Sequence, residues 1–84
     1  MSVERIGEKF TQMMREVYWV NKKTRHDVIV QFMGHINTVN VSLYEGGYDP
    51  MQKAVHIGMV DFGERGAMGK LNEMKHKLKE FRKK

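Results

Sequence analysis

The chain has 84 residues, which is enough for one domain with a single modest core. Its 40% apolar and 30% charged residues are typical of a globular protein, and the lack of cysteine excludes disulfides, thiolate metal sites and a cysteine nucleophile. No apolar run approaches the roughly 20 residues that span a bilayer, and the first residues show no signal pattern. We therefore expect a cytoplasmic protein that makes no membrane contact.

The net charge of +5 is concentrated at one end of the sequence. Residues 1–69 hold eight Lys or Arg and eight Asp or Glu, whereas residues 70–84 hold seven Lys or Arg and two Asp or Glu. All of the excess positive charge therefore belongs to the last fifteen residues.

The first predicted element is an amphipathic helix over residues 3–19, with Ser2 as its N-cap. Its apolar residues recur at spacings of three and four: Val3, Ile6, Phe10, Met13, Met14, Val17 and Val20. We expect the polar segment 21–26 to end this helix.

Three strands are predicted next, over residues 28–33, 39–44 and 55–60, because the apolar period changes to two. One set of alternating residues is more apolar and is expected to face the core: Val28, Val30, Phe32, Val39, Val41, Leu43, Val55, Ile57 and Met59. The first connection is short and requires antiparallel pairing, and the second contains Gly46, Gly47 and Pro50.

A second helix is predicted after the glycine-rich segment 63–69, with one apolar stripe of Leu71, Met74, Leu78 and Phe81. Residues 82–84 are expected to fray. The elements together predict an α+β fold of order α-β-β-β-α, in which a three-stranded antiparallel meander carries both helices on one face. The chain is then a single domain, 1–84.

The other face of the sheet would remain uncovered, and its composition is mixed. It would carry Ile29, Gln31, Met33, Asn40, Ser42, Tyr44, His56, Gly58 and Val60. This face is too apolar for ordinary surface and too polar for a second core.

No set of residues indicates catalysis or metal binding. The four histidines are His26, His35, His56 and His76, and they belong to separate segments without metal-ligand spacing. Neither Ser2 nor Ser42 lies in a nucleophile motif, and the glycines of 63–69 match no phosphate-binding pattern. We expect no enzymatic activity, no cofactor and no small-molecule substrate.

The favoured hypothesis is a small binding or accessory protein that engages a protein partner, or a second copy of itself as a homodimer. The contact residues would be Ile29, Met33, Tyr44, Tyr48 and His56, on the uncovered face and in the loop 44–51.

The alternative hypothesis is nucleic-acid binding through the basic second helix. Its lysines and arginine flank the apolar stripe on both sides: Lys70, Lys75, Lys77, Lys79 and Arg82. The opposing interpretation is that these residues complement the helix dipole and keep the protein in solution.

Two resemblances accompany these patterns. The order of elements is similar to that of double-stranded-RNA-binding domains, which use lysines at the start of the second helix, but segment 63–70 here lacks the lysine pair. Segment 35–50, a strand followed by an aromatic-acidic-Gly-Gly-aromatic turn, resembles segments of small uncharacterised phage and prophage proteins of Gram-positive bacteria. The second resemblance implies an accessory protein in the host cytoplasm.

Overall fold

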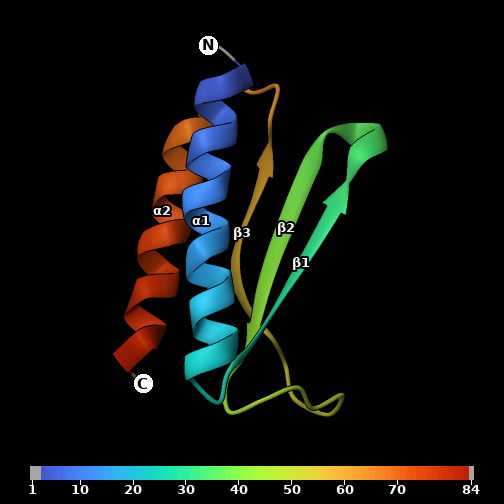
Figure 1. Cartoon of the computed structure of the whole chain (residues 1–84). Helices are drawn as coiled ribbons and strands as arrows, with labels where there is room; N and C mark the ends of the chain where they lie inside the picture. Colours follow the sequence, from blue (N-terminus) through green and yellow to red (C-terminus); the bar gives the residue numbers. More distant parts are fainter. Residues whose placement is uncertain (1–2, 84) are drawn as a thin grey trace.

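The computed structural model describes residues 3–83, and Ser2, the expected N-cap, lies outside them. The order of elements is α1 (Val3–Lys23), β1 (Asp27–Met33), β2 (Thr38–Tyr44), β3 (Val55–Asp61) and α2 (Ala67–Glu80), with short 3₁₀ helices at Gly34–Ile36 (η1) and Phe81–Lys83 (η2). The sheet is antiparallel with the order β1-β2-β3, and both helices pack on one of its faces (Figure 1). The predicted fold class is confirmed.

Helix α1 continues one turn beyond its predicted end, to Lys23. Its end is fixed at Thr24, whose amide and hydroxyl both donate to the Val20 carbonyl, at 3.1 and 2.6 Å. Lys22 and Lys23 occupy the last turn, where cations complement the negative end of the helix dipole.

The first two strands pair over seven residues, and the pairing places Val28 opposite Leu43 and Phe32 opposite Val39. The connection between them is η1 followed by Asn37 in the left-handed conformation, with φ of 54°. Asparagine tolerates this conformation better than most residues. The strands diverge from α1 toward this turn, so the hairpin tip stands clear of the helix (Figure 1).

The side chains of β3 do not alternate regularly between the two faces of the sheet along the whole strand. A β-bulge at the Val41/Ser42 step shifts the pairing of β2 with β3 by one residue. Ile57 points to the core as predicted, but beyond it Val60 is fully buried and Met59 is 54% exposed. The prediction that Met59 faces the core and that Gly58 and Val60 face solvent was therefore wrong.

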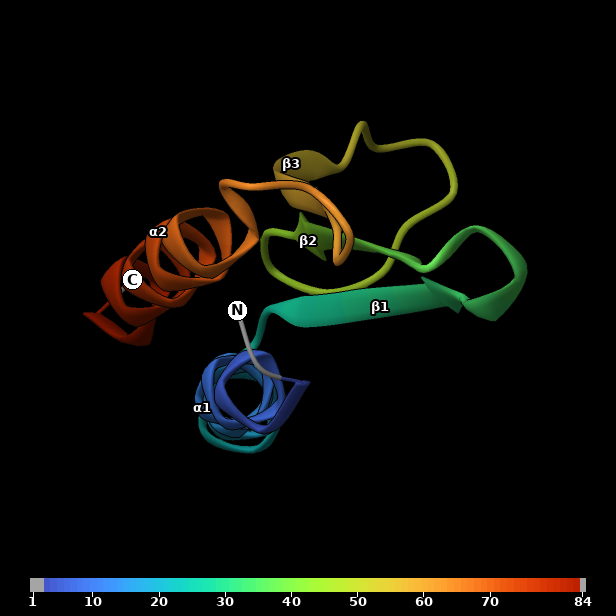
Figure 2. The same ribbon diagram turned by 90° about the horizontal axis from the view of Figure 1, so that it is seen from above.

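The core lies between the sheet and the two helices, which run in the same direction side by side (Figures 1 and 2). Its most buried members are Met13, Val20, Val39, Val41, Leu43, Ile57, Val60, Leu71 and Leu78. Helix α2 packs tightly on the sheet at Gly58, where an added Cβ would lie 2.7 Å from Met74 Cγ. Glycine at this position therefore sets how closely α2 packs on β3.

Residues expected to fray are partly ordered by tertiary contacts. Arg82 and Lys83 lie in η2, and Lys84 falls outside the described residues. The Arg82 Nε is 3.2 Å from Glu16 Oε1, and its guanidinium stacks 4.2 Å from the centre of the Trp19 ring. The end of the second helix is thereby attached to α1.

Candidate protein-binding surface

The uncovered face of the sheet, called the open face below, is organised as rows of side chains across the strands. The pairing gives three rows from edge to edge: Ile29–Ser42–His56, Gln31–Asn40–Met59 and Met33–Thr38–Asp61. A shorter row joins Asp27 and Tyr44. The central strand contributes a polar side chain to each of the three rows, and each row has one apolar side chain on an edge strand: Ile29, Met59 and Met33.

The predicted contact residues are only partly brought together. Ile29 and His56 share a row, and Tyr44 lies on the central strand one step along. Met33 lies four residues from Ile29 on β1, which corresponds to about 13 Å along a strand. Ile29 is 44% exposed, whereas Met33 is only partly accessible.

The loop after β2 is fixed to the start of β1 by two hydrogen bonds. The Gly46 amide donates to His26 Nδ1 at 3.0 Å, and the Tyr48 amide donates to Asp27 Oδ2 at 2.6 Å. The imidazole of His26 is itself buried and packs edge-on against Phe81. The loop is therefore positioned by residues that precede and begin β1.

These bonds place the two tyrosines against each other at the rim of the open face. The ring centres of Tyr44 and Tyr48 are 5.0 Å apart at an interplanar angle of 74°. Tyr48 remains 60% exposed. A preformed aromatic pair with one free face suits protein contact, since little side-chain entropy is lost on binding.

Two consecutive glycines make this loop conformation accessible. Gly46 and Gly47 have φ of 78° and 115°, values that side-chain-bearing residues rarely adopt. A Cβ on Gly47 would make only an ordinary contact, 3.5 Å from the Arg25 carbonyl oxygen, so the requirement for glycine comes from the backbone angle. The Gly-Gly pair is therefore what allows the chain to turn back toward Asp27.

Sequence reasoning missed Met59, which is the most exposed apolar side chain of the strands on the open face. No local signal could have found it, because its orientation depends on the bulge in the β2–β3 pairing. Methionine is flexible and polarizable, and it is frequent on surfaces that bind proteins.

An apolar groove on the helix side was also missed. It has a volume of about 330 Å³ and is lined by Ile6, Gly7, Phe10, Phe32, Asn37 and Phe62. The rings of Phe10, Phe32 and Phe62 contact one another with centre separations of 5.5 to 6.4 Å. Phe32 points to the helix side as predicted, but it is 55% exposed because α1 and the hairpin tip diverge.

The basic residues of the alternative hypothesis are mostly engaged within the protein. Lys70 pairs with Glu64 at 2.8 Å, and Arg82 contacts Glu16 and Trp19 as described above. The remaining contacts are from Lys75 Nζ to Gln12 Oε1 at 3.5 Å and from Lys77 Nζ to the Ile57 carbonyl at 3.3 Å. Of the five, only Lys79 has no such contact with the described residues.

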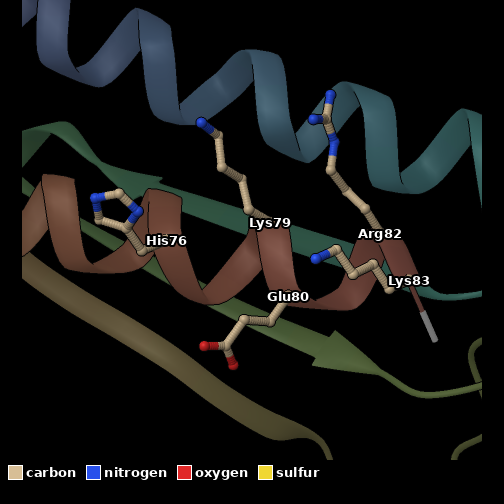
Figure 3. Close-up of a pocket in the computed structure, with 5 residues that line it drawn as sticks. All are labelled: His76, Lys79, Glu80, Arg82 and Lys83. Carbon is tan, nitrogen blue, oxygen red and sulfur yellow. The ribbon is translucent and has the colours of Figure 1, made fainter.

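A hollow of about 620 Å³ lies at the end of α2 and is lined by His76, Lys79, Glu80, Arg82 and Lys83. Figure 3 shows that its side chains do not converge: Lys79 and Arg82 point toward α1, while Glu80 points away from it. This geometry does not form one compact anion site. These contacts do not test nucleic-acid binding, which stays a prediction.

Within residues 3–83, no three His, Asp or Glu side chains gather in a way that would hold a metal ion, and neither helix is long and apolar enough to cross a membrane. The sequence matches no protein-family model and no curated protein, and the structure matches no solved structure. The function must therefore be inferred from the surface that the fold presents.

Proposed function

We propose that this protein is a non-enzymatic binding or accessory protein that takes a protein partner on its open face. The observation that carries the proposal is the exposure of three large side chains on one side of the molecule. Ile29, Met59 and Tyr48 are 44%, 54% and 60% exposed, and they come from β1, β3 and the loop after β2. Large apolar groups grouped on a rigid sheet are typical of interaction surfaces.

The centre of the open face is polar, because β2 contributes the half-buried Asn40 and Ser42 to two of the rows. Polar groups that are buried in an interface without hydrogen bonds cost free energy. We therefore expect the partner to present hydrogen-bonding groups among its apolar side chains.

The net charge of +5 does not select the partner of the open face, because all of the excess positive charge belongs to residues 70–84 and α2 packs on the opposite side of the sheet. The charged residues in the rows of the open face are Asp27 and Asp61. The proposal is therefore a protein partner with an apolar patch. A cytoplasmic location, or the host cytoplasm for a phage protein, belongs to the same proposal.

A matched pair of variants tests the surface. Met59→Lys places a charge on the open face, whereas Tyr18→Lys introduces the same charge at a 67% exposed position on α1, outside the proposed contact surface. The wild-type chain is used to capture a partner, which is then purified and titrated by calorimetry with each variant. We expect Met59→Lys to weaken binding at least about tenfold, because a charge would be buried in the interface, and Tyr18→Lys to change it less than about twofold.

Two results would overturn the proposal. One is equal affinity of the captured partner for the wild type and Met59→Lys. The other is the absence of any stoichiometric protein partner in the capture experiment. Circular dichroism of both variants checks that the fold is unchanged.

The nucleic-acid alternative has a separate test. If it holds, the wild type binds a DNA or RNA duplex at low salt. Lys79→Gln then makes the slope of log affinity against log salt less steep by up to about 0.9, the contribution of one phosphate contact. Lys79 is preferred for this test because its replacement disturbs no ion pair in the described part of the chain. No binding at low salt would end this alternative.

A further inference from the structure

The two edges of the sheet are protected to different extents. Along β3, the Lys77 ammonium group donates to the carbonyl of Ile57 at 3.3 Å, and α2 contacts the strand. Along β1, protection comes from the last turn of α1. The Val28 amide donates to Asn21 Oδ1 at 2.7 Å, and Asn21 Nδ2 donates to the Val28 carbonyl at 3.2 Å.

The Asn21 contact also identifies which backbone groups of β1 remain free. Because the amide and carbonyl of Val28 point away from β2, the alternation of an antiparallel strand points those of Val30 and Phe32 away as well. Among the described residues, no side chain or turn bonds these outward groups. The outward backbone hydrogen-bonding groups of β1 are therefore occupied at Val28 and free at Val30 and Phe32.

An open edge of this kind is a template for pairing with another strand. Native proteins usually block such edges with a charge or a proline, but residues 28–33 contain neither. The edge also has exposed apolar side chains on both sides of the sheet, Ile29 on the open face and Phe32 on the helix side. These features favour occupation of the edge over its exposure to solvent.

We propose that the occupant is a second copy of this chain, whose β1 pairs antiparallel with this one to give a six-stranded sheet. Since Asn21 occupies the groups of Val28, the available register uses only Val30 and Phe32. The two-fold axis then passes beside Gln31, and Val30 forms a hydrogen-bonded pair with Phe32 of the second copy. Four backbone hydrogen bonds join the two edges in this arrangement.

The side chains are self-complementary in this register. On the open face, Ile29 lies beside Met33 of the second copy, and the two Gln31 amides face each other across the axis. On the helix side, Val30 lies beside Phe32 of the second copy and covers part of its exposed ring. No like charges are opposed between positions 28 and 33, because these residues are uncharged.

The proposed dimer contact lies at the edge of β1, whereas the proposed partner binds the open face, and the two surfaces share Ile29. Pairing would double the open face into one continuous surface on which each copy presents its own Met59 and Tyr48. A partner with two equivalent patches would then bind with avidity.

The first test uses a single-cysteine variant. Because the chain contains no cysteine, the introduced thiol is the only one that can form a disulfide. Gln31→Cys places two thiols across the axis at a non-hydrogen-bonded pair, where Cα atoms are about 4.5 Å apart, within the range that a disulfide spans. We expect a disulfide-linked dimer under mild oxidation and none for Gln52→Cys, an exposed loop position. Equal slow crosslinking of both variants would overturn the proposed register.

A charge swap gives the second test. Gln31 is exposed, so that Gln31→Lys and Gln31→Glu should both fold. Each alone opposes like charges across the axis, and we expect about tenfold weaker self-association by sedimentation. An equimolar mixture should restore the dimer, because Lys then faces Glu.

Three results would overturn the proposal: a monomeric wild type at all concentrations, unchanged self-association of both charged variants, or a mixture that associates no better than either variant alone. The control that separates this inference from the proposed function is Met59→Lys, which lies on the opposite edge strand. It should leave self-association unchanged while it weakens partner binding.

Discussion

The contact between Asn21 and the edge of β1 leads to a stability prediction that can be worked out from the structure. Asn21→Ala removes two hydrogen bonds, of 2.7 and 3.2 Å, to the amide and carbonyl of Val28. Each bond contributes about 1 kcal/mol net. Alanine is the better helix former, which offsets about 0.5 kcal/mol of the loss.

The expected outcome is a decrease of about 1.5 kcal/mol in the free energy of unfolding. For a domain of this size, that decrease corresponds to a melting temperature lower by about 6 to 12 °C. Urea denaturation followed by circular dichroism measures the free energy, and thermal denaturation measures the temperature. Amide hydrogen exchange should show in addition that Val28 loses protection.

The matched control is Lys23→Ala, an exposed residue in the same last turn of α1. It gains the helix propensity without losing a bond to β1, and its stability should stay within about 0.5 kcal/mol of the wild type. A variant Asn21→Ala that is as stable as Lys23→Ala would contradict this prediction. A Val28 amide that stays protected in Asn21→Ala would contradict it as well.

Three further predictions concern the helix packing and the loop. Gly58→Ala should lower the free energy of unfolding by about 1–3 kcal/mol, because the added methyl group overlaps with Met74. The decrease should be smaller in a Met74→Val background, and an equal decrease in both backgrounds would contradict the proposed overlap. Arg82→Gln should cost about 1 kcal/mol in urea denaturation, since the exposed part of the pair is screened, and a double-mutant cycle with Glu16→Gln should be non-additive rather than additive. Asp27→Ala should speed hydrogen exchange of the Tyr48 amide and weaken partner binding severalfold while the domain stays folded; unchanged exchange would show that the 2.6 Å bond does not hold the loop.

Most of the architecture could be predicted because its signals are local. The three-four spacing from Ile6 to Val20 and the alternation in the strands each depend on neighbouring residues alone. The short first connection fixed the antiparallel pairing, and the apolar sides of the helices and sheet left one compact arrangement.

The phase of β3 could not be predicted, because a bulge is a property of two strands. The sequence from Val55 to Val60 alternates equally well in either phase, since both sets contain apolar residues. The pairing with β2 decides between them, and Met74 occupies the space above Gly58 that a side chain would need. A tertiary contact therefore determined that Met59 would join the open face.

The candidate site was predictable to a similar degree. Exposure of Ile29 and Tyr48 followed from the alternation and from the loop composition. The bonds of His26 and Asp27 to the loop could not be foreseen, because they join residues about twenty positions apart. The exposure of Phe32 has the same kind of cause, since it depends on where α1 leaves the hairpin.

The side-by-side packing of α1 and α2 has a consequence for the order of folding. Residues 24–66, which include the whole meander, lie between the two helices, so their contact closes a long loop at a high entropic cost. The β1–β2 turn closes a very short one. The β1–β2 hairpin is therefore expected to form first. The apolar side chains of α1 stay partly exposed to solvent until α2 packs against them.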